Sequence, residues 1–180
     1  MEDYSRYEQE IVRLFYDYTD TVLWFPDPVP YDEARLSPEL TEALRAWGRR
    51  HDEGLRVDQR WQSPDLPAQL AAELPELVER VGDELGSAFT VEYTSRPDDP
   101  MAWAGSRKVR YRSTEPPTNP DASAAFEARA AAARAEAEER AQRASAGPNP
   151  NVVMARRDGT TGEWFAIQPR SGKIFRPPSG

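Results

Sequence analysis

The positions of the prolines constrain the fold of this chain more than any other feature of its sequence. There are 17 prolines in 180 residues, nearly twice the usual share. Proline lacks a backbone N–H and fixes φ, so it is disfavoured inside helices and central strands. The prolines gather within residues 26–30, 64–67, 95–121 and 147–180. These clusters divide the chain into segments that have to form separate elements.

The first of these segments, residues 3–22, fits two kinds of structure. Its large apolar residues fall at helical spacing, at positions 4, 7, 11, 14, 15, 18 and 22. The run from Ile11 to Tyr16 is nevertheless rich in β-branched and aromatic residues, which favours a strand of about six residues. Both structures therefore stay open for residues 9–17 on these patterns alone. The prolines at 26, 28 and 30 exclude a regular helix or strand ladder immediately afterwards.

Two amphipathic helices are predicted next. Ser37 is a suitable N-cap with Pro38 at the first helical position, and Leu40, Leu44, Trp47 and His51 share one face of that helix. The second helix carries apolar residues at 66, 70, 74, 77, 81 and 85, and Pro75 is expected to kink or divide it. Gly86 is a suitable C-terminal glycine. Residues 88–93 then alternate apolar and polar side chains, which predicts a strand.

The second half of the chain is organised differently. Residues 95–121 form a Pro-rich crossover that includes a short basic strand at 107–112, expected at a sheet edge. An alanine-rich helix follows, capped by Asp121 or Ser123, and because Phe126 is its only large apolar residue we expect an arm, a spacer or a lightly packed cover. Three short strands at 152–155, 164–167 and 173–175 predict a β-meander.

These elements predict an α+β fold: a small sheet packed by two main helices, followed by a long Ala/Glu/Arg-rich helix and a C-terminal β-meander. The expected divisions are an acidic α+β domain at 1–94, the crossover at 95–121, the helix at 122–146 and the meander at 147–180. No stretch is apolar enough over a sufficient length to predict a membrane span. No basic segment precedes an apolar one at the N-terminus, so we expect no signal peptide and a cytoplasmic protein.

The charge is distributed unevenly along the chain. The whole chain has a net charge of −8, but residues 1–94 hold 9 basic and 21 acidic side chains, a net −12, whereas residues 95–180 hold 14 and 10, a net +4. The front half should therefore repel nucleic acid and attract a basic protein surface. We accordingly expect a basic protein partner, and neither a nucleic acid nor a membrane as partner.

Few side chains in this sequence suit catalysis. There is no cysteine and only one histidine, His51, so disulfides, thiolate sites and multi-histidine metal sites are excluded. His51 follows Arg49 and Arg50 and precedes Asp52 and Glu53, but no serine or cysteine is placed as an evident nucleophile. The many carboxylates show no spacing typical of a calcium loop or a paired-carboxylate site. We therefore favour a packing role for His51 and expect no cofactor and no bound metal.

The front half resembles a group of small uncharacterised α+β proteins from GC-rich bacteria, over roughly residues 9–94. The resemblance is carried by Leu14-Phe15-Tyr16-Asp17-Tyr18, Leu23-Trp24, Leu36-Ser37-Pro38-Glu39-Leu40, Leu44, Trp47, Asp52, Leu55, Glu84-Leu85-Gly86 and Val91-Glu92-Tyr93. It implies a strand for residues 9–17. The position of His51 is usually tyrosine in that group, which implies an aromatic core position. No activity is known for that group, so the resemblance implies none for this chain.

The sequence thus favours a non-enzymatic interaction protein, in concrete form an acidic protein of immunity type that masks a basic partner. The expected contact residues are acidic side chains after the first helix, tryptophans in polar loops and basic residues of the crossover strand: Asp52, Glu53, Asp58, Trp61, Trp103, Arg110 and Arg112. One alternative is a structural or adaptor subunit of a larger assembly. A second alternative is a hydrolase that uses carboxylates with His51.

Overall fold

The structure of the whole chain is a computed structural model. The structure describes residues 7, 9–56, 58, 60–95, 106–145, 154–157, 164–167 and 174–175. Backbone contacts divide the chain into two compact units, residues 1–134 and 135–180. Trp103 lies outside the described residues.

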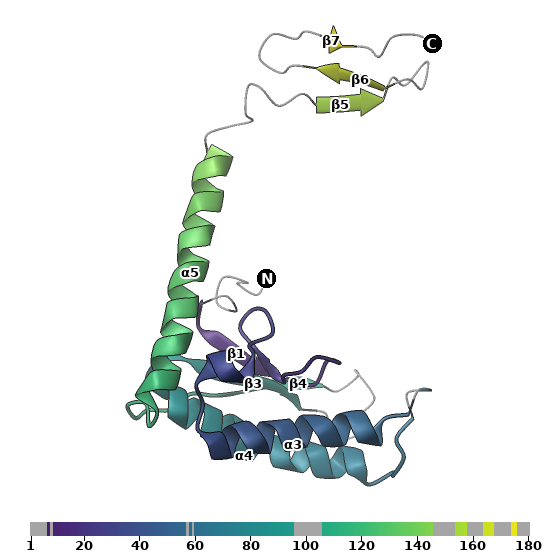
Figure 1. Ribbon diagram of the computed structural model, residues 1–180, viewed down its shortest axis with the longest axis vertical. Coiled ribbons are helices and arrows are strands. Elements are labelled where there is room, and N and C mark those ends of the chain that lie inside the picture. The colour runs from purple at the N-terminus through teal and green to yellow at the C-terminus, as the bar shows by residue number, and fades with distance from the viewer. Residues whose placement is uncertain are drawn as a thin grey trace. The chain divides into compact units, whose positions relative to one another are not determined.

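The first unit is built on a four-stranded mixed sheet (Figure 1). Its strands are β1 (Ile11–Leu14), β2 (Leu23–Trp24), β3 (Thr90–Ser95) and β4 (Arg107–Tyr111), in the order β2-β1-β3-β4. The two central strands, β1 and β3, are parallel, and the outer strands pair antiparallel with them. The strand prediction for the first segment is therefore confirmed. The β-branched run of β1 is buried on the central strand of a sheet, where such side chains pack well.

Helices cover one face of this sheet, as Figure 1 shows. They are α2 (Tyr31–Ala34), α3 (Pro38–Gly54) and α4 (Leu66–Leu85), followed by the 3₁₀ turn η1 (Gly86–Ala88). The Ser37 hydroxyl caps α3 by accepting a hydrogen bond from the Leu40 N–H at 3.3 Å, as its sequence predicts. Pro75 does not divide α4, which is a single helix of 20 residues. Gly86, at φ 74°, ends it in a conformation that favours glycine.

The two faces of the sheet differ in chemistry. Val12, Leu14 and Val91 belong to the hydrophobic core that α3 and α4 cover. The register places Trp24 beside Arg13, Arg13 beside Glu92, and Glu92 beside Arg110, so these four form one row across the sheet. Successive residues of a strand point to opposite faces, so this polar row lies on the face away from the core. The sheet is therefore apolar toward α3 and α4 and charged on its other side. This is an α+β fold with one helical layer.

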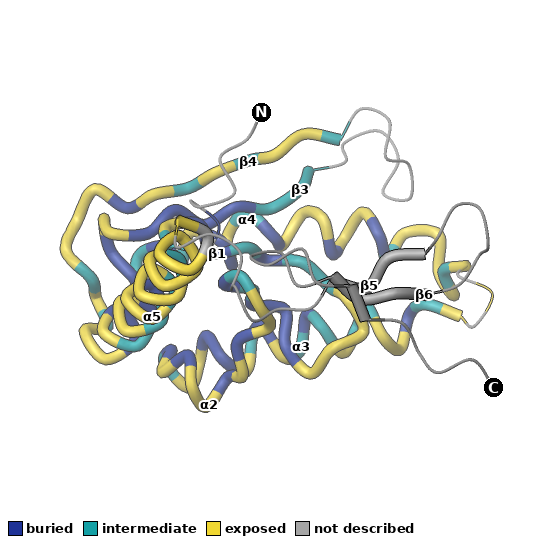
Figure 2. Tube along the Cα trace, turned by 90° about the horizontal axis from the view of Figure 1, so that it is seen from above, coloured by how far each residue is buried: buried dark blue, intermediate teal, exposed yellow. Residues whose placement is uncertain are grey.

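The long helix α5 (Pro120–Ser145) begins two residues before the predicted start. Asn119 caps it, with Oδ1 accepting from the Ala122 N–H at 3.2 Å, so the predicted caps Asp121 and Ser123 are wrong. The first half of α5 is packed rather than free: Phe126 is fully buried, and its ring lies 5.6 Å from Phe25 and 5.9 Å from Phe89. Figure 2 shows the remainder of the helix as mostly exposed. The alanine-rich sequence did not indicate that the single ring of Phe126 would attach the first half of α5 to the hydrophobic core.

The second unit contains the predicted meander. Its strands are β5 (Met154–Arg157), β6 (Trp164–Ile167) and β7 (Ile174–Phe175), in the order β5-β6-β7 with antiparallel pairing. Strand β5 begins at Met154, two residues after the predicted start at residue 152. Among the helices of the described part of the chain, none has the length and apolar character needed to cross a bilayer.

Candidate protein-binding site

An aromatic cluster connects the surface of the first unit to its core. It consists of Tyr16 and Tyr18 from the loop between β1 and β2, Trp47 and His51 from α3, and Trp61 from the loop before α4. The outermost ring, Tyr18, lies edge-on to Tyr16 at 5.2 Å, and Tyr16 stacks on His51 at 4.9 Å with an angle of 9° between the planes. His51 in turn contacts Trp47 at 4.5 Å and Trp61 at 5.3 Å. These ring contacts therefore hold Tyr18, the exposed end of the cluster, in a fixed position.

Tyr18 is the unusual member of this cluster. Tyr18 is 68% exposed and is the only exposed large hydrophobic residue among the residues whose burial the structure describes, all of which lie within residues 7–145. Its φ of 43° places a bulky aromatic residue in the left-handed region, which such residues rarely adopt. Strained backbone of this kind tends to occur at functional sites. A rigid, exposed aromatic side chain is also a frequent hot spot in protein interfaces.

An open cleft of about 370 Å³ lies beside Tyr18, between the β1–β2 loop and α3. Asp20 and Tyr16 line it from the loop, and Arg45 and Arg49 line it from α3. Asp52 also lines it and belongs in addition to a second, more open hollow at the end of α3. The aromatic cluster, the cleft and the hollow thus form one continuous surface, here called the α3-end surface.

Hydrogen bonds and charges fix the walls of the cleft. Tyr16 donates its hydroxyl hydrogen to Asp52 Oδ1 at 2.7 Å. Burial, followed by the hydrogen bond to Asp52, raises the pKa of Tyr16 well above its ordinary value near 10. Arg49 donates to Glu42 Oε1 at 2.8 Å, which raises the pKa of Arg49 and lowers that of Glu42. Arg45 lies over the ring of Tyr31, 5.1 Å from its centre.

The structure brings four of the seven predicted contact residues together on this surface. Asp52, Glu53 and Asp58 are exposed and line the hollow at the end of α3. Trp61 is half-buried beside them, packed against the core, and its backbone bridges to Leu55. Trp61 therefore supports the surface from below, with only part of its ring available for contact. Whether a partner touches these residues stays a prediction.

The predicted residues Arg110 and Arg112 lie elsewhere, on and just after the edge strand β4. Arg110 donates from Nε and Nη2 to Glu92 Oε2, both at 2.8 Å, and this pairing raises the pKa of Arg110. Arg112 Nε donates to the Ser87 carbonyl at 2.6 Å. Both guanidinium groups therefore have contacts within the chain. Figure 2 shows β4 at the side of the unit away from α3.

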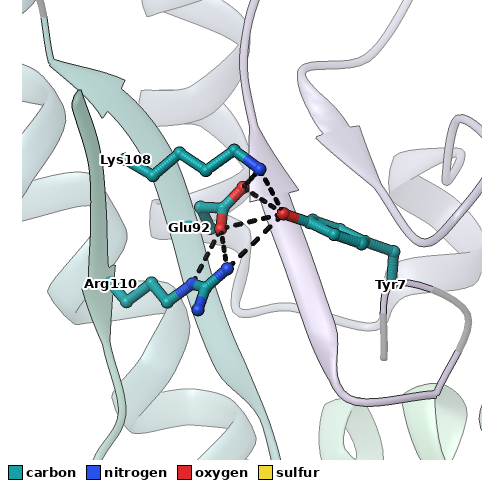
Figure 3. A network of polar contacts seen from close by, with 4 residues as sticks. All are labelled: Tyr7, Glu92, Lys108 and Arg110. Carbon is teal, nitrogen blue, oxygen red and sulfur yellow. Dashed lines mark hydrogen bonds and ion pairs between the residues drawn. The ribbon is translucent and has the colours of Figure 1, made fainter. Parts of the chain in front are cut away.

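Glu92 is the centre of this second polar network (Figure 3). Its carboxylate is nearly buried, with 5% of the side chain exposed, and accepts from the Tyr7 hydroxyl at 3.3 Å. Lys108 Nζ lies 3.9 Å from Glu92 and 2.5 Å from the Tyr7 oxygen. The network fastens Tyr7 to the charged face of the sheet. These contacts give Glu92 a structural role, as the shared acceptor of a polar network on the sheet.

The placement of the carboxylates and of His51 bears on the metal-site and hydrolase alternatives. Within them, no group of three or more His, Asp or Glu side chains is placed to hold a metal ion. The His51 ring contacts the rings of Tyr16, Trp47 and Trp61, which fits the packing role that the sequence favours. The geometry of the α3-end surface is suited to contact with another macromolecule.

Comparison with known families bears on the same part of the chain. Residues 10–96 match the model of a family described as Serratia CdiI immunity protein-like. The match runs from just before β1 to just after β3 and so includes every residue of the α3-end surface. It ends before β4, α5 and the second unit. A search of curated protein sequences found no match.

Sequence reasoning missed Tyr16 and Tyr18 as surface residues. The spacing of Tyr18 from Ile11, Leu14 and Val22 suggested a helical stripe, and Tyr16 was placed at the end of the predicted strand. The chain instead turns away from β1 directly after Leu14. The signal that pointed to a turn was local: Asp17, Thr19 and Asp20 surround Tyr18, and such polar residues are common in turns.

Proposed function

We propose that this chain is an immunity-type protein that binds a toxin domain in the cytoplasm and neutralises it by association, without catalysis. The observation that carries the proposal is the coincidence of two ranges. The family match covers residues 10–96, and Tyr16, Tyr18, Asp52, Asp58 and Trp61 all lie within it. The α3-end surface therefore lies within the segment that matches the family model.

The charge of the matched segment supports a basic partner. Residues 10–96 hold 18 acidic and 9 basic side chains, an excess of 9 acidic ones. The exposed acidic side chains of the α3-end surface belong to this excess and lie at the proposed point of contact. A field of this sign accelerates association with a basic surface and weakens as salt is added.

The rigidity of the surface supports inhibition by binding. Trp47 Nε1 donates to the Leu70 carbonyl at 2.9 Å, joining α3 to α4 directly beneath the aromatic cluster. A surface that is already ordered loses little conformational freedom when a partner binds. The α3-end surface has this property because each of its rings rests on another ring.

Affinity capture tests the proposal. The tagged chain is used to capture proteins from its native cells at low salt, and whatever co-elutes is identified by mass spectrometry. We expect one stoichiometric basic partner that 300 mM salt releases in large part. Salt shortens the Debye length from about 30 Å at 0.01 M to less than about 10 Å above 0.1 M, so the attraction between exposed charges is screened. An acidic partner, or a partner whose affinity is indifferent to salt, would contradict the electrostatic form of the proposal.

A further inference from the structure

We propose that the cleft beside Tyr18 receives an arginine side chain of the partner, which stacks on the Tyr18 ring and pairs with the carboxylates of Asp20 and Asp52. The identity of the partner rests on the proposed function, whereas the chemistry of the cleft does not. The proposal concerns only the first unit of the chain.

The loop that carries Tyr18 is held in place before any partner arrives. The Thr19 hydroxyl donates to the Thr21 carbonyl at 2.7 Å, and the Thr21 hydroxyl accepts from the Leu23 N–H at 3.1 Å. The Val22 N–H donates to the Tyr31 hydroxyl at 3.3 Å, which ties the loop to α2. These bonds maintain a backbone conformation that Tyr18 itself disfavours. The Tyr18 ring is thus held on the surface, edge-on to Tyr16.

The charges around the cleft favour a cationic occupant. Asp17 and Asp20 are exposed and make no ion pair or hydrogen bond within the described part of the chain. Asp52 accepts from Tyr16 and keeps further lone pairs for a second donor. Of the two cations that line the cleft, Arg49 pairs with Glu42, and Arg45 lies over the face of Tyr31 and keeps its charge. The free hydrogen-bond acceptors beside Tyr18 are the carboxylates of Asp17 and Asp20, together with the remaining lone pairs of Asp52.

An arginine fits this arrangement better than a lysine. A guanidinium group is planar, stacks on an aromatic ring and donates two parallel hydrogen bonds to a carboxylate. The cleft presents both partners, with the ring of Tyr18 and the carboxylates of Asp20 and Asp52 among its lining residues. A volume of about 370 Å³ is enough for one long side chain.

Small probes test the chemistry of the cleft without the partner. Nuclear magnetic resonance follows the full chain during titration with N-acetyl-arginine amide, its neutral isostere N-acetyl-citrulline amide and N-acetyl-glutamate amide. We expect saturable shifts at residues 16–20 and 45–52, with the arginine probe binding roughly 3- to 10-fold tighter than citrulline. Asp20→Asn should remove that preference, whereas the matched change Asp32→Asn, at an exposed residue outside the cleft, should keep it. Equal binding of citrulline, or tighter binding of glutamate, would overturn the proposal.

A variant of Tyr18 separates contact from folding. Tyr18→Asn places a residue that tolerates positive φ at this position, so the urea midpoint should stay the same or rise. Binding to a captured partner should weaken by at least about 10-fold, as for an interface hot spot. If the wild-type chain captures no partner, the proposed function fails while the probe result stands. If the wild type captures a partner and Tyr18→Asn binds it equally well, the arginine proposal fails and the proposed function stands.

Discussion

Tyr16 and Asp52 join the β1–β2 loop to the end of α3 through a hydrogen bond of 2.7 Å from the tyrosine hydroxyl to Oδ1. The same tyrosine ring stacks on His51, one residue before Asp52. This pair of contacts fixes the loop against the helix and sets the position of the neighbouring Tyr18. The pair is thus the structural basis of the α3-end surface.

The Tyr16–Asp52 hydrogen bond predicts a loss of stability at alkaline pH. The pKa of Tyr16 is raised in the folded chain, by burial first and by Asp52 second, so above the ordinary value near 10 the unfolded chain binds fewer protons than the folded one. The stabilisation is therefore complete below pH of about 10 and declines as pH rises further toward the folded pKa. Urea unfolding measured at a series of alkaline pH values checks this decline. Tyr16→Phe should make it shallower, and an unchanged slope would contradict the role assigned to Tyr16.

Phe126 is predicted to hold the first half of α5 on the core. Phe126→Ala should lower the free energy of unfolding by about 3–5 kcal/mol, because it removes a fully buried ring from between Phe25 and Phe89. Urea denaturation followed by tryptophan fluorescence measures the change. Ala131→Ser, at an exposed position of the same helix, should change it by less than about 0.5 kcal/mol. Equal effects of the two changes would show that α5 is not packed at Phe126.

Glu92 is predicted to be required for the charged face of the sheet. Glu92→Ala leaves Arg110, Lys108 and Tyr7 without their shared acceptor. The expected loss is about 2–3 kcal/mol, less than for a fully buried ion pair because the side chains of Arg110 and Lys108 are 38% and 43% exposed. Glu139→Ala breaks the exposed pair with Arg143 and should change stability by less than about 0.5 kcal/mol. Chemical denaturation of both variants under the same conditions measures the two changes in the free energy of unfolding. Equal changes would contradict the role assigned to Glu92.

Two glycines in the helices should respond in opposite ways to alanine. A Cβ at Gly82 would lie 2.5 Å from Cδ1 of Tyr111, whose hydroxyl is held by Asp83. Gly82→Ala should therefore cost about 1–3 kcal/mol. At Gly48 the nearest contact would be the Val22 Cγ1 at 3.2 Å, and alanine improves helix propensity by up to about 1 kcal/mol. Thermal unfolding of the two variants should show a lower Tm for Gly82→Ala only.

Much of the fold was predictable because local chemistry and tertiary packing agree. Ser37 and Pro38 mark the start of α3, and Gly86 marks the end of α4, through backbone requirements that few other residues meet. The parallel pairing of β1 with β3 was not predictable from those patterns, since it depends on contacts between residues about eighty positions apart. The packing of α5 escaped prediction for the same reason, because the partners of Phe126 lie far away in the sequence.

The candidate site was predictable in part. The acidic residues after α3 could be proposed from charge alone, and Asp52, Glu53 and Asp58 do line one hollow. Tyr18 could not be recognised, because apolar spacing alone does not distinguish a buried stripe from a ring that a strained turn holds outward. Arg110 was proposed on its charge, but its contact with Glu92 depends on strand register. Charge is visible in a sequence, whereas the partners of a charge are not.

Growth of cells that express the captured partner tests the central claim most directly. The partner is expressed from an inducible promoter, alone or together with this chain. The account predicts that growth stops when the partner is expressed alone and resumes when the chain is present, with Tyr18→Asn giving less protection than the wild type. A partner that is harmless alone, or that arrests growth equally in the presence of this chain, would contradict the claim that the chain is an immunity-type protein.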